Sequence, residues 1–158
     1  MTEHPMIRKE RCSMDKKIRV LFVCGQNTAR SQMAEAFVNS LGEERFEAES
    51  AGLEAGPGIN PLAAAVMKEI GLDISGNAVK KVFDLYVAGK TYHYVVAVCD
   101  KAKADRCPIF PGMLVERLDW PFDDPASLEG SEEEKLEGAR RIRDRIKEKV
   151  EAFLRDVS

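Results

Sequence analysis

The chain has 158 residues, 44% of them apolar, and this length and composition suit one compact domain that folds without disulfide bonds. Its 24 basic and 27 acidic residues give a net charge of −3, which gives no reason to expect a protein that coats nucleic acid. It shows neither an apolar run long enough for a membrane span nor a secretory signal, so we expect a cytoplasmic protein. Thiols stay reduced in that compartment, so the four cysteines are candidates for chemistry or packing rather than for structural disulfides.

Strands and helices alternate along the predicted domain, residues 17–158, which follows a charged extension at 1–16 that is expected to be disordered. The most strongly patterned element is the last helix, which opens with the capping box "SEEE" and carries one apolar stripe opposite a charged face. In chain order we expect a strand at 18–23, a helix at 29–41 stopped by Gly42, a strand at 46–50, and a helix capped by Asn60 and ended by Gly71. A short helix including Val82, Phe83 and Tyr86 follows, then a strand at 94–98 and a weaker strand at 114–118. The apolar stripe of the last helix comprises Leu136, Ala139, Ile142, Ile146, Val150 and Phe153.

This alternation predicts an α/β fold, a three-layer α/β/α sandwich with a four-stranded parallel sheet. In such sheets ligands bind where the carboxyl ends of the strands meet. Cys24 and Cys99 each directly follow an apolar predicted strand. The two thiols are therefore expected at the same edge of the sheet.

The segment "CGQNTAR", residues 24–30, joins the first strand to the first helix and predicts an anion site, because a short loop can aim its backbone N–H groups at one centre beside a helix N-terminus. Arg30 adds a planar fork of donors suited to a tetrahedral oxyanion. The same field stabilises a thiolate at Cys24, which favours a nucleophile aimed at phosphate or a similar species. The expected substrate-binding residues are Gly25, Gln26, Asn27, Thr28, Ala29, Arg30 and Ser31.

The alternative at this loop is a packed thiol with Arg30 on the surface, since a cysteine and an arginine at this spacing also occur by chance. The position between strand and helix, with Asn27 and Ser31 available for hydrogen bonds, favours the nucleophile. The Walker phosphate-binding pattern is absent, and "AGLEAGPG", residues 51–58, does not fit the dinucleotide fingerprint. We interpret residues 51–58 as a flexible loop near the site.

The remaining cysteines leave two interpretations open. Cys107 follows Cys99 after seven intervening residues, which is not zinc-ligand spacing but suits a segment in which two thiols meet after local rearrangement. The alternative is one packed cysteine and one loop cysteine. Cys12 lies in the charged extension and is interpreted as incidental.

The acidic loop "WPFDDPA", residues 120–126, also has two interpretations. An Asp near the first loop could act as a general acid that protonates a leaving oxygen. From the residues alone, an Asp-Pro turn that opens the last helical region is slightly favoured.

Five segments together resemble the thioredoxin-coupled arsenate reductases, which share the fold of the low-molecular-weight protein tyrosine phosphatases. The resemblance covers residues 17–157 and is carried by "VLFVCGQNTARSQMAEAF", "ESAG", "GLDIS", "VVAVC" with a second cysteine downstream, and "WPFDDPA". It implies that Cys24 attacks arsenate held by the loop amides and Arg30. It further implies that Ser31 stabilises the thiolate and that Asp124, directly before Pro125, protonates the departing oxygen.

The resemblance also implies a relay of three cysteines. Cys99 would attack Cys24 in the thiol–arsenate adduct, which releases arsenite and leaves a Cys24–Cys99 disulfide. Cys107 would then attack Cys99, and thioredoxin would reduce the resulting Cys99–Cys107 disulfide. The implied enzyme detoxifies arsenic, needs no cofactor or metal, and acts as a monomer away from nucleic acid and membranes.

Three features depart from the family's usual pattern. The spacing of the last two cysteines is one residue longer than usual, and Gln26 stands where a small residue is common. Some members bind potassium through an Asn, a Glu, a Ser and an Asp. Asn27, Glu35 and Ser50 match these positions, but the Asp position falls near Lys80, whose ammonium could replace the cation. We therefore predict no dependence on potassium.

Two rival functions remain open. A phosphatase for phosphotyrosine or a small phosphoester would use Cys24, Arg30 and Asp124 without the other cysteines, although Ala126 and Ser127 stand where phosphatases usually carry tyrosines. A protein that senses oxidation through its thiols is the other rival. Such a sensor would lose thiols to peroxide but not to arsenate.

Overall fold

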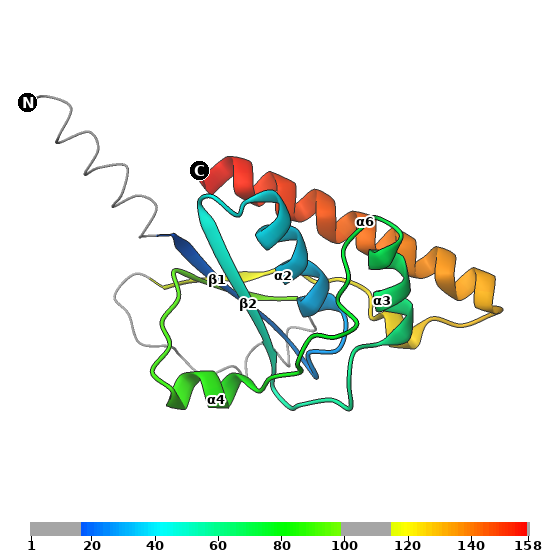
Figure 1. The fold of residues 1–158 in the computed structure, drawn as a ribbon, viewed down its shortest axis with the longest axis horizontal. Coiled ribbons are helices and arrows are strands. Elements are labelled where there is room, and N and C mark those ends of the chain that lie inside the picture. The colour runs from blue at the N-terminus through cyan, green and yellow to red at the C-terminus, as the bar shows by residue number, and fades with distance from the viewer. Residues whose placement is uncertain (1–16, 99–114, 158) are drawn as a thin grey trace, which may run out of the picture.

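The protein is represented by a computed structural model that describes residues 17–98 and 115–157. Four parallel strands form one sheet in the order β2-β1-β3-β4, which confirms the predicted sheet (Figure 1). At its carboxyl edge Cys24 pairs with Gly52 of the neighbouring strand. The strands are β1 (Ile18–Cys24), β2 (Phe46–Gly52), β3 (Tyr94–Ala97) and β4 (Glu116–Asp119).

The helices follow the local signals of the sequence closely. Asn60 caps its helix as predicted, because its Oδ1 accepts the N–H groups of Leu62 at 2.8 Å and Ala63 at 3.3 Å. That helix ends at Lys68, earlier than expected, and Gly71 takes a left-handed φ of 84° beyond it. The helices are α2 (Arg30–Leu41), α3 (Pro61–Lys68), α4 (Val82–Val87), the 3-10 turn η1 (Pro125–Ser127) and α6 (Glu132–Val157).

The fourth strand lies slightly later in the chain than the sequence predicts. β4 begins at Glu116 and ends at Asp119, whereas the predicted strand covers residues 114–118. Its side chains are mostly exposed, and Leu118 is the member that packs against the core. An edge strand covered so little has no strong apolar alternation to mark its ends.

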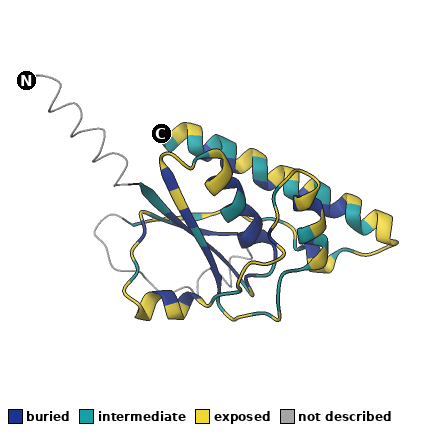
Figure 2. Ribbon diagram, viewed as in Figure 1, coloured by how far each residue is buried: buried dark blue, intermediate teal, exposed yellow. Residues whose placement is uncertain are grey.

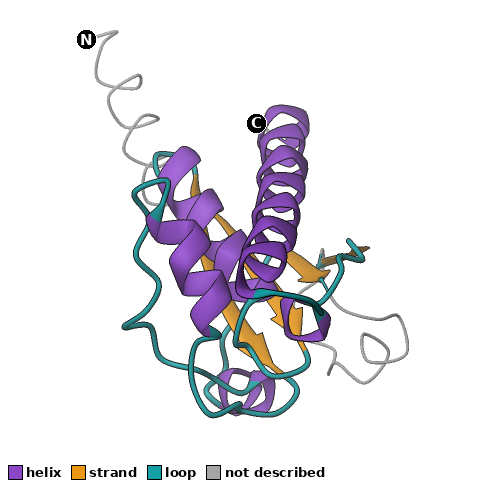
Figure 3. Ribbon diagram, turned by 90° about the vertical axis from the view of Figure 1, so that its right-hand side faces the viewer, coloured by secondary structure: helices purple, strands orange, loops and turns teal. Residues whose placement is uncertain are grey.

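The side chains of β1 separate the two faces of the sheet. Val20 and Phe22 pack with α2 and α6 on one face, whereas Leu21 and Val23 pack with Val82 of α4 on the other. Successive side chains of a strand point to opposite faces, so this buried strand contributes to both cores (Figure 2). The result is the predicted three-layer arrangement (Figure 3). Among the described residues, α4 is the helix that covers the second face of the sheet.

The long helix α6 packs along one face of the sheet, from its carboxyl edge to the opposite edge. Its capping box forms as predicted: Ser131 Oγ accepts the N–H of Glu134 at 3.1 Å, and Glu134 Oε1 accepts the N–H of Ser131 at 3.0 Å. Near the other end the Phe153 ring lies 5.1 Å from that of Tyr94 and 5.4 Å from that of Trp120. The predicted stripe is buried at Ala139, Ile142, Ile146, Val150 and Phe153, and partly buried at Leu136.

Several predictions fall on residues that lie outside the described ranges. These are the disordered extension at 1–16 and the positions of Cys99 and Cys107. Within the ranges that are described, no helix combines the length and the apolar character needed to cross a membrane.

Candidate active site

Cys24 lies at the carboxyl end of β1, where the sheet meets the first turn of α2. Its side chain is 3% exposed. The sulfur accepts the backbone N–H of Asn27 at 3.1 Å and lies 2.9 Å from Ser31 Oγ. The thiol is thus buried among hydrogen-bonding groups rather than packed only by apolar side chains, which favours a reactive thiol over the packed alternative.

Residues 53–60 determine which backbone groups of the loop at 24–30 face the pocket. Leu53, Glu54 and Gly56 donate their backbone N–H groups to the carbonyls of residues 24, 25 and 26, each at 3.0 Å. Asn60 does the same to the carbonyl of residue 28 at 2.8 Å. Because these carbonyls are bound from outside, they are turned away from the pocket that the loop encloses. A ring of N–H groups around an enclosed centre is an anion-binding arrangement.

Residues 51–58 lie near the site, as the sequence predicts, but their contact with the loop is not visible in the sequence. Two glycines allow it. A Cβ on Gly52 would lie 2.7 Å from the carbonyl carbon of Gln26, and a Cβ on Gly56 would lie 2.5 Å from Thr28 Cγ2. Glycine is thus required at position 52, where the two backbones approach each other, whereas the nearest atom at Gly56 belongs to the Thr28 side chain.

The start of α2 leaves donors for a ligand. Ala29 precedes the helix, and its methyl group cannot accept a hydrogen bond from the N–H groups of the first turn. Such groups are otherwise satisfied by a capping side chain, water or a bound anion. The uncapped helix end therefore adds to the electropositive character of the loop.

Arg30 is held against the segment at 122–124, and its 8% exposure excludes the alternative of a surface arginine. One guanidinium nitrogen donates to the carbonyl of Phe122 at 3.0 Å. Another lies 3.6 Å from Oδ2 of Asp124. These contacts fix the guanidinium plane at the rim of the pocket and bring the predicted acid beside it.

Asp124 forms the turn that the sequence favoured, and its place beside Arg30 leaves the general-acid role a prediction. Its Oδ1 accepts the N–H of Ala126 at 2.9 Å and so caps η1, which is the turn. Its Oδ2 faces Arg30, and the side chain remains 41% exposed. The carboxyl group is therefore held by the turn while one oxygen stays open to the pocket and to solvent.

The loop and Asp124 enclose a cavity of about 200 Å³, large enough for a tetrahedral oxyanion. Most of the predicted site residues meet there. Its lining comprises Cys24, Gly25, Gln26, Thr28, Ala29, Arg30, Asp124 and Ala126. Asn27 and Ser31 lie behind the sulfur, with both side chains buried.

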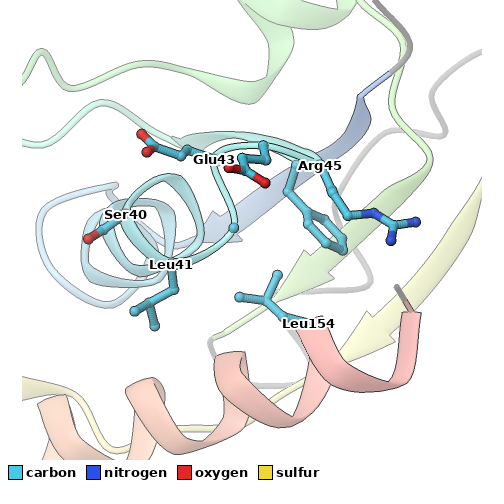
Figure 4. Close-up of a pocket in the computed structure, with 8 residues that line it drawn as sticks. Ser40, Leu41, Glu43, Arg45 and Leu154 are labelled. Carbon is cyan, nitrogen blue, oxygen red and sulfur yellow. The ribbon is translucent and has the colours of Figure 1, made fainter. Parts of the chain in front are cut away.

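A larger hollow of about 290 Å³ lies elsewhere, at the turn between α2 and β2. Ser40, Leu41, Glu43 and Arg45 surround it, and Leu154 projects into it from α6 (Figure 4). Its lining contains neither a cysteine nor any of the predicted site residues. We therefore assign the chemistry to the smaller cavity.

Two partly buried carboxylates, Glu35 and Glu49, bear on the predicted potassium independence. Burial raises the pKa of Glu35, although the hydrogen bond from Ser50 at 2.8 Å and the charge of Lys80 act in the opposite direction. Lys80 also lies 3.8 Å from Glu49, through its ammonium group. The positive charge of Lys80 thus acts on both Glu35 and Glu49, and independence of potassium stays a prediction. Within the described ranges, no group of three or more His, Cys, Asp or Glu side chains is arranged to hold a metal ion.

Of the two carboxylates, Glu49 has the more favourable surroundings for its charged form. Burial alone would raise its pKa, but a hydrogen bond from the Tyr92 hydroxyl at 3.0 Å and the ammonium of Lys90 at 3.3 Å outweigh it. The net effect lowers the pKa of Glu49. The carboxylate is therefore charged in the folded protein at neutral pH.

Sequence reasoning missed the side chains of Gln32 and Asn77 and the backbone contact of Lys80, which hold the loop from behind. The side-chain amide of Gln32 donates to Asn27 Oδ1 at 3.1 Å, and the backbone N–H of Lys80 donates to the same oxygen at 2.9 Å. Asn77 in turn donates to Gln32 at 3.1 Å. The sequence carries no local signal of these contacts, which surround Asn27 at its left-handed φ of 61°, a conformation that asparagine adopts more readily than most residues.

Comparison with known proteins is consistent with this geometry. The family model described as low molecular weight phosphotyrosine protein phosphatase matches residues 19–158. Proteins called arsenate reductase from Halalkalibacterium halodurans and Bacillus subtilis are 42% and 41% identical over 140 residues, which cover 89% of this chain and 96% of each relative.

Solved structures give the same grouping. A structure described as an arsenate reductase in oxidized state matches with a TM-score of 0.73 and 31% identity, over 89% of this chain and 98% of the other. The low molecular weight protein tyrosine phosphatase from T. tengcongensis matches with a TM-score of 0.70 and 26% identity, over 89% and 100% of the two chains. The chain therefore belongs to the low molecular weight phosphotyrosine protein phosphatase family, in the group that contains the arsenate reductases.

Proposed function

We propose that this protein reduces arsenate to arsenite. The observation that carries the proposal is the buried Cys24 sulfur, which lies 2.9 Å from Ser31 Oγ at a cavity lined by the loop and by Arg30. The relatives named arsenate reductase, 42% and 41% identical, support this choice of oxyanion. A related structure described as an arsenate reductase in the phosphate binding state supports binding of tetrahedral anions by the same fold.

Arsenate would be bound by charge and by directed N–H groups. The backbone of residues 25–30 supplies donors, since its carbonyls at 25, 26 and 28 are bound from outside. Arg30 is held at the pocket rim by Phe122, where its guanidinium would donate to the arsenate oxygens. Binding would thus place the arsenic atom next to the sulfur of Cys24.

The first chemical step joins sulfur to arsenic. The Cys24 thiolate attacks the arsenic atom, an S–As bond forms, and one As–O bond breaks. The leaving hydroxyl group takes a proton from Asp124 and departs as water. Asp124 suits this role because its second oxygen is engaged by the N–H of Ala126, which holds the carboxyl group in place.

The second step transfers two electrons to arsenic. The thiolate of Cys99 attacks the Cys24 sulfur, the S–As bond breaks with its electron pair going to arsenic, and arsenite leaves. Cys107 then attacks the Cys99 sulfur and frees Cys24 as a thiolate. Cys99 and Cys107 lie outside the described residues, so this relay rests on the order of the cysteines in the chain and on the family resemblance.

The reductant in this proposal is thioredoxin. The relay ends in a Cys99–Cys107 disulfide, and a dithiol protein restores it by exchange without a further thiol from solution. The cycle starts from reduced thiols, so we place it in the cytoplasm, where thiols are kept reduced.

A single-turnover experiment tests the proposal. Fully reduced protein is mixed with arsenate in the absence of any reductant, and arsenite and free thiols are counted. We expect about one arsenite formed and two thiols lost per chain, with both changes abolished in Cys24→Ser. Peptide mapping should then find the Cys99–Cys107 disulfide. Arsenate that leaves every thiol free would overturn the proposal.

Phosphatase activity is the second candidate, because the same cavity with Arg30 and Asp124 suits a phosphoester and the family includes tyrosine phosphatases. The two functions differ in their need for the later cysteines. A Cys99→Ser variant should keep phosphoester hydrolysis and lose arsenite formation. Ala126 in the cavity wall offers no aromatic surface for phosphotyrosine, which makes a small phosphoester the better probe.

A further inference from the structure

Gln32 is a buried amide on the first turn of α2 that faces away from the substrate cavity. Its side chain is 1% exposed. Its nitrogen donates to Asn27 Oδ1 at 3.1 Å, to the Ala78 carbonyl at 3.0 Å and, at 3.3 Å, to the Asn27 carbonyl. Its oxygen accepts from the side chain of Asn77 at 3.1 Å. The Gln32 side chain thus joins the loop at 24–30 to residues 77 and 78, which precede α4.

These contacts fix which end of the Gln32 amide faces Asn27. The carbonyl of Ala78 can only accept, so it requires the nitrogen of Gln32 on its side. The side-chain nitrogen of Asn77 satisfies the oxygen on the other side. Gln32 is therefore presented to Asn27 as a donor.

The orientation of the Asn27 amide follows from its own two donors. Its Oδ1 accepts from Gln32 at 3.1 Å and from the backbone N–H of Lys80 at 2.9 Å. A backbone N–H can only donate, so the oxygen must face this side. The amide nitrogen of Asn27 is left to donate to Ser31 Oγ at 2.8 Å.

The Ser31 hydroxyl group has one proton to donate, and the contacts above leave the Cys24 sulfur as its acceptor. Its oxygen already accepts from Asn27, and the Cys24 sulfur lies 2.9 Å away on the other side. The hydroxyl proton therefore points at the sulfur, which also receives the N–H of Asn27. Two donors are thus aimed at one sulfur, and hydrogen bonds to a charged acceptor are stronger than those to a neutral one.

We propose that Gln32 is a positioning residue: with the backbone of Lys80 it fixes the polarity of the Asn27 amide, so that the Ser31 hydroxyl donates toward Cys24. The inference deepens the proposed function, because it concerns the same nucleophile. Of the described residues that line the cavity, Arg30 and Asp124 are the charged groups that face Cys24, and both stay in place in the variants below.

The test is the pH dependence of Cys24 alkylation, measured without arsenate. The tryptic peptide of residues 20–30 contains no other cysteine, so mass spectrometry follows Cys24 in the full chain. Gln32→Met keeps the side-chain length and removes the donor. We expect the midpoint of its alkylation profile to rise by about one pH unit, which is about tenfold slower alkylation below the midpoint. Gln32→Glu should shift it at least as far, because a carboxylate accepts where Gln32 donates.

A second amide on the same helix is the matched control. Asn39 of α2 also joins two segments, since it donates to the Ala48 carbonyl at 3.1 Å and accepts its N–H at 2.8 Å. Asn39→Ala should lower thermal stability and leave the alkylation midpoint unchanged. If Gln32→Met does not fold, Asn77→Ala replaces it, with a smaller shift expected in the same direction.

The outcomes separate this inference from the proposed function. An unchanged midpoint in Gln32→Met, or an equal shift in Asn39→Ala, overturns the positioning role whether or not the protein reduces arsenate. A shift confined to Gln32→Glu overturns it too, because charge alone would explain it. Failure of the single-turnover assay in the unmodified protein would instead reject the reductase and leave the hydrogen-bond polarity intact.

Discussion

A methyl group added at Gly52 should disturb the loop at residues 24–30. Gly52 pairs with Cys24 at the end of the sheet, and a Cβ there would lie 2.5 Å from the Glu54 carbonyl oxygen, 2.7 Å from the Gln26 carbonyl carbon and 2.8 Å from the Asn27 nitrogen. All three are backbone atoms, and ordinary contact begins at 3.4 Å. In Gly52→Ala each distance must therefore lengthen by more than half an ångström.

The cost of that movement falls on both stability and chemistry. Overpacking of this kind typically costs about 1 to 3 kcal/mol, so we expect the midpoint of thermal unfolding to fall by about 2 to 12 °C. The Asn27 nitrogen that must move is also the donor to the Cys24 sulfur at 3.1 Å. A displacement approaching 1 Å at a reacting group can cost about 100-fold in rate, and we expect a loss of that order.

Thermal unfolding and single-turnover arsenite formation measure the two effects on the same sample. Gly76→Ala is the matched control, because a methyl group on Gly76 would have no neighbouring atom within 4 Å and the φ of Gly76 lies outside the left-handed region. That control should retain both stability and rate. A Gly52→Ala protein with unchanged rate and unfolding midpoint would refute the idea that close backbone contact shapes the loop.

Three further predictions follow from contacts around the site. Asp124→Asn keeps an oxygen that can cap Ala126 but loses the acidic proton, so adduct formation should slow by about 100-fold or more in stopped-flow assays, and an unchanged rate would exclude the general-acid role. Exchanging KCl for NaCl at constant ionic strength should not change turnover, since the charge of Lys80 already acts on Glu35, whereas strong activation by potassium would contradict this. The pKa of Glu49 lies below 4.5, so its charge stabilises the folded state above pH 4.5 and this stabilisation is lost as the pH falls through the lowered value. Urea unfolding of Glu49→Gln should therefore lose less free energy between neutral pH and about pH 3 than the unmodified protein, and equal losses would argue against this linkage.

Local sequence signals predicted most of the fold. The β-branched run of β1 and the caps at Asn60 and Ser131 depend on neighbouring residues, and each formed as expected. The bounds predicted for the exposed edge strand β4 were wrong, because few buried side chains mark its ends. Short-range patterns are reliable where the same few residues both carry the signal and form the element.

The candidate site divides along the same line. The loop at 24–30 was recognisable because its residues are contiguous. The contribution of Gln32 was not, since its partners Asn77 and Ala78 lie more than 40 residues away and Ala78 acts through its backbone. The support from residues 53–60 is likewise made by backbone atoms, whose positions follow from the pairing of β1 with β2 and leave little trace in side-chain identity.

The length of α6 has a practical consequence for attaching the protein to a surface. Its 26 residues span about 39 Å, from the turn that holds Asp124 to the edge where Leu154 meets the end of α2. A tag that follows Val157 would therefore emerge far from the cavity. Immobilised through that tag on an electrode or a bead, the protein would present the cavity beside Cys24 outward, where solutes can reach it.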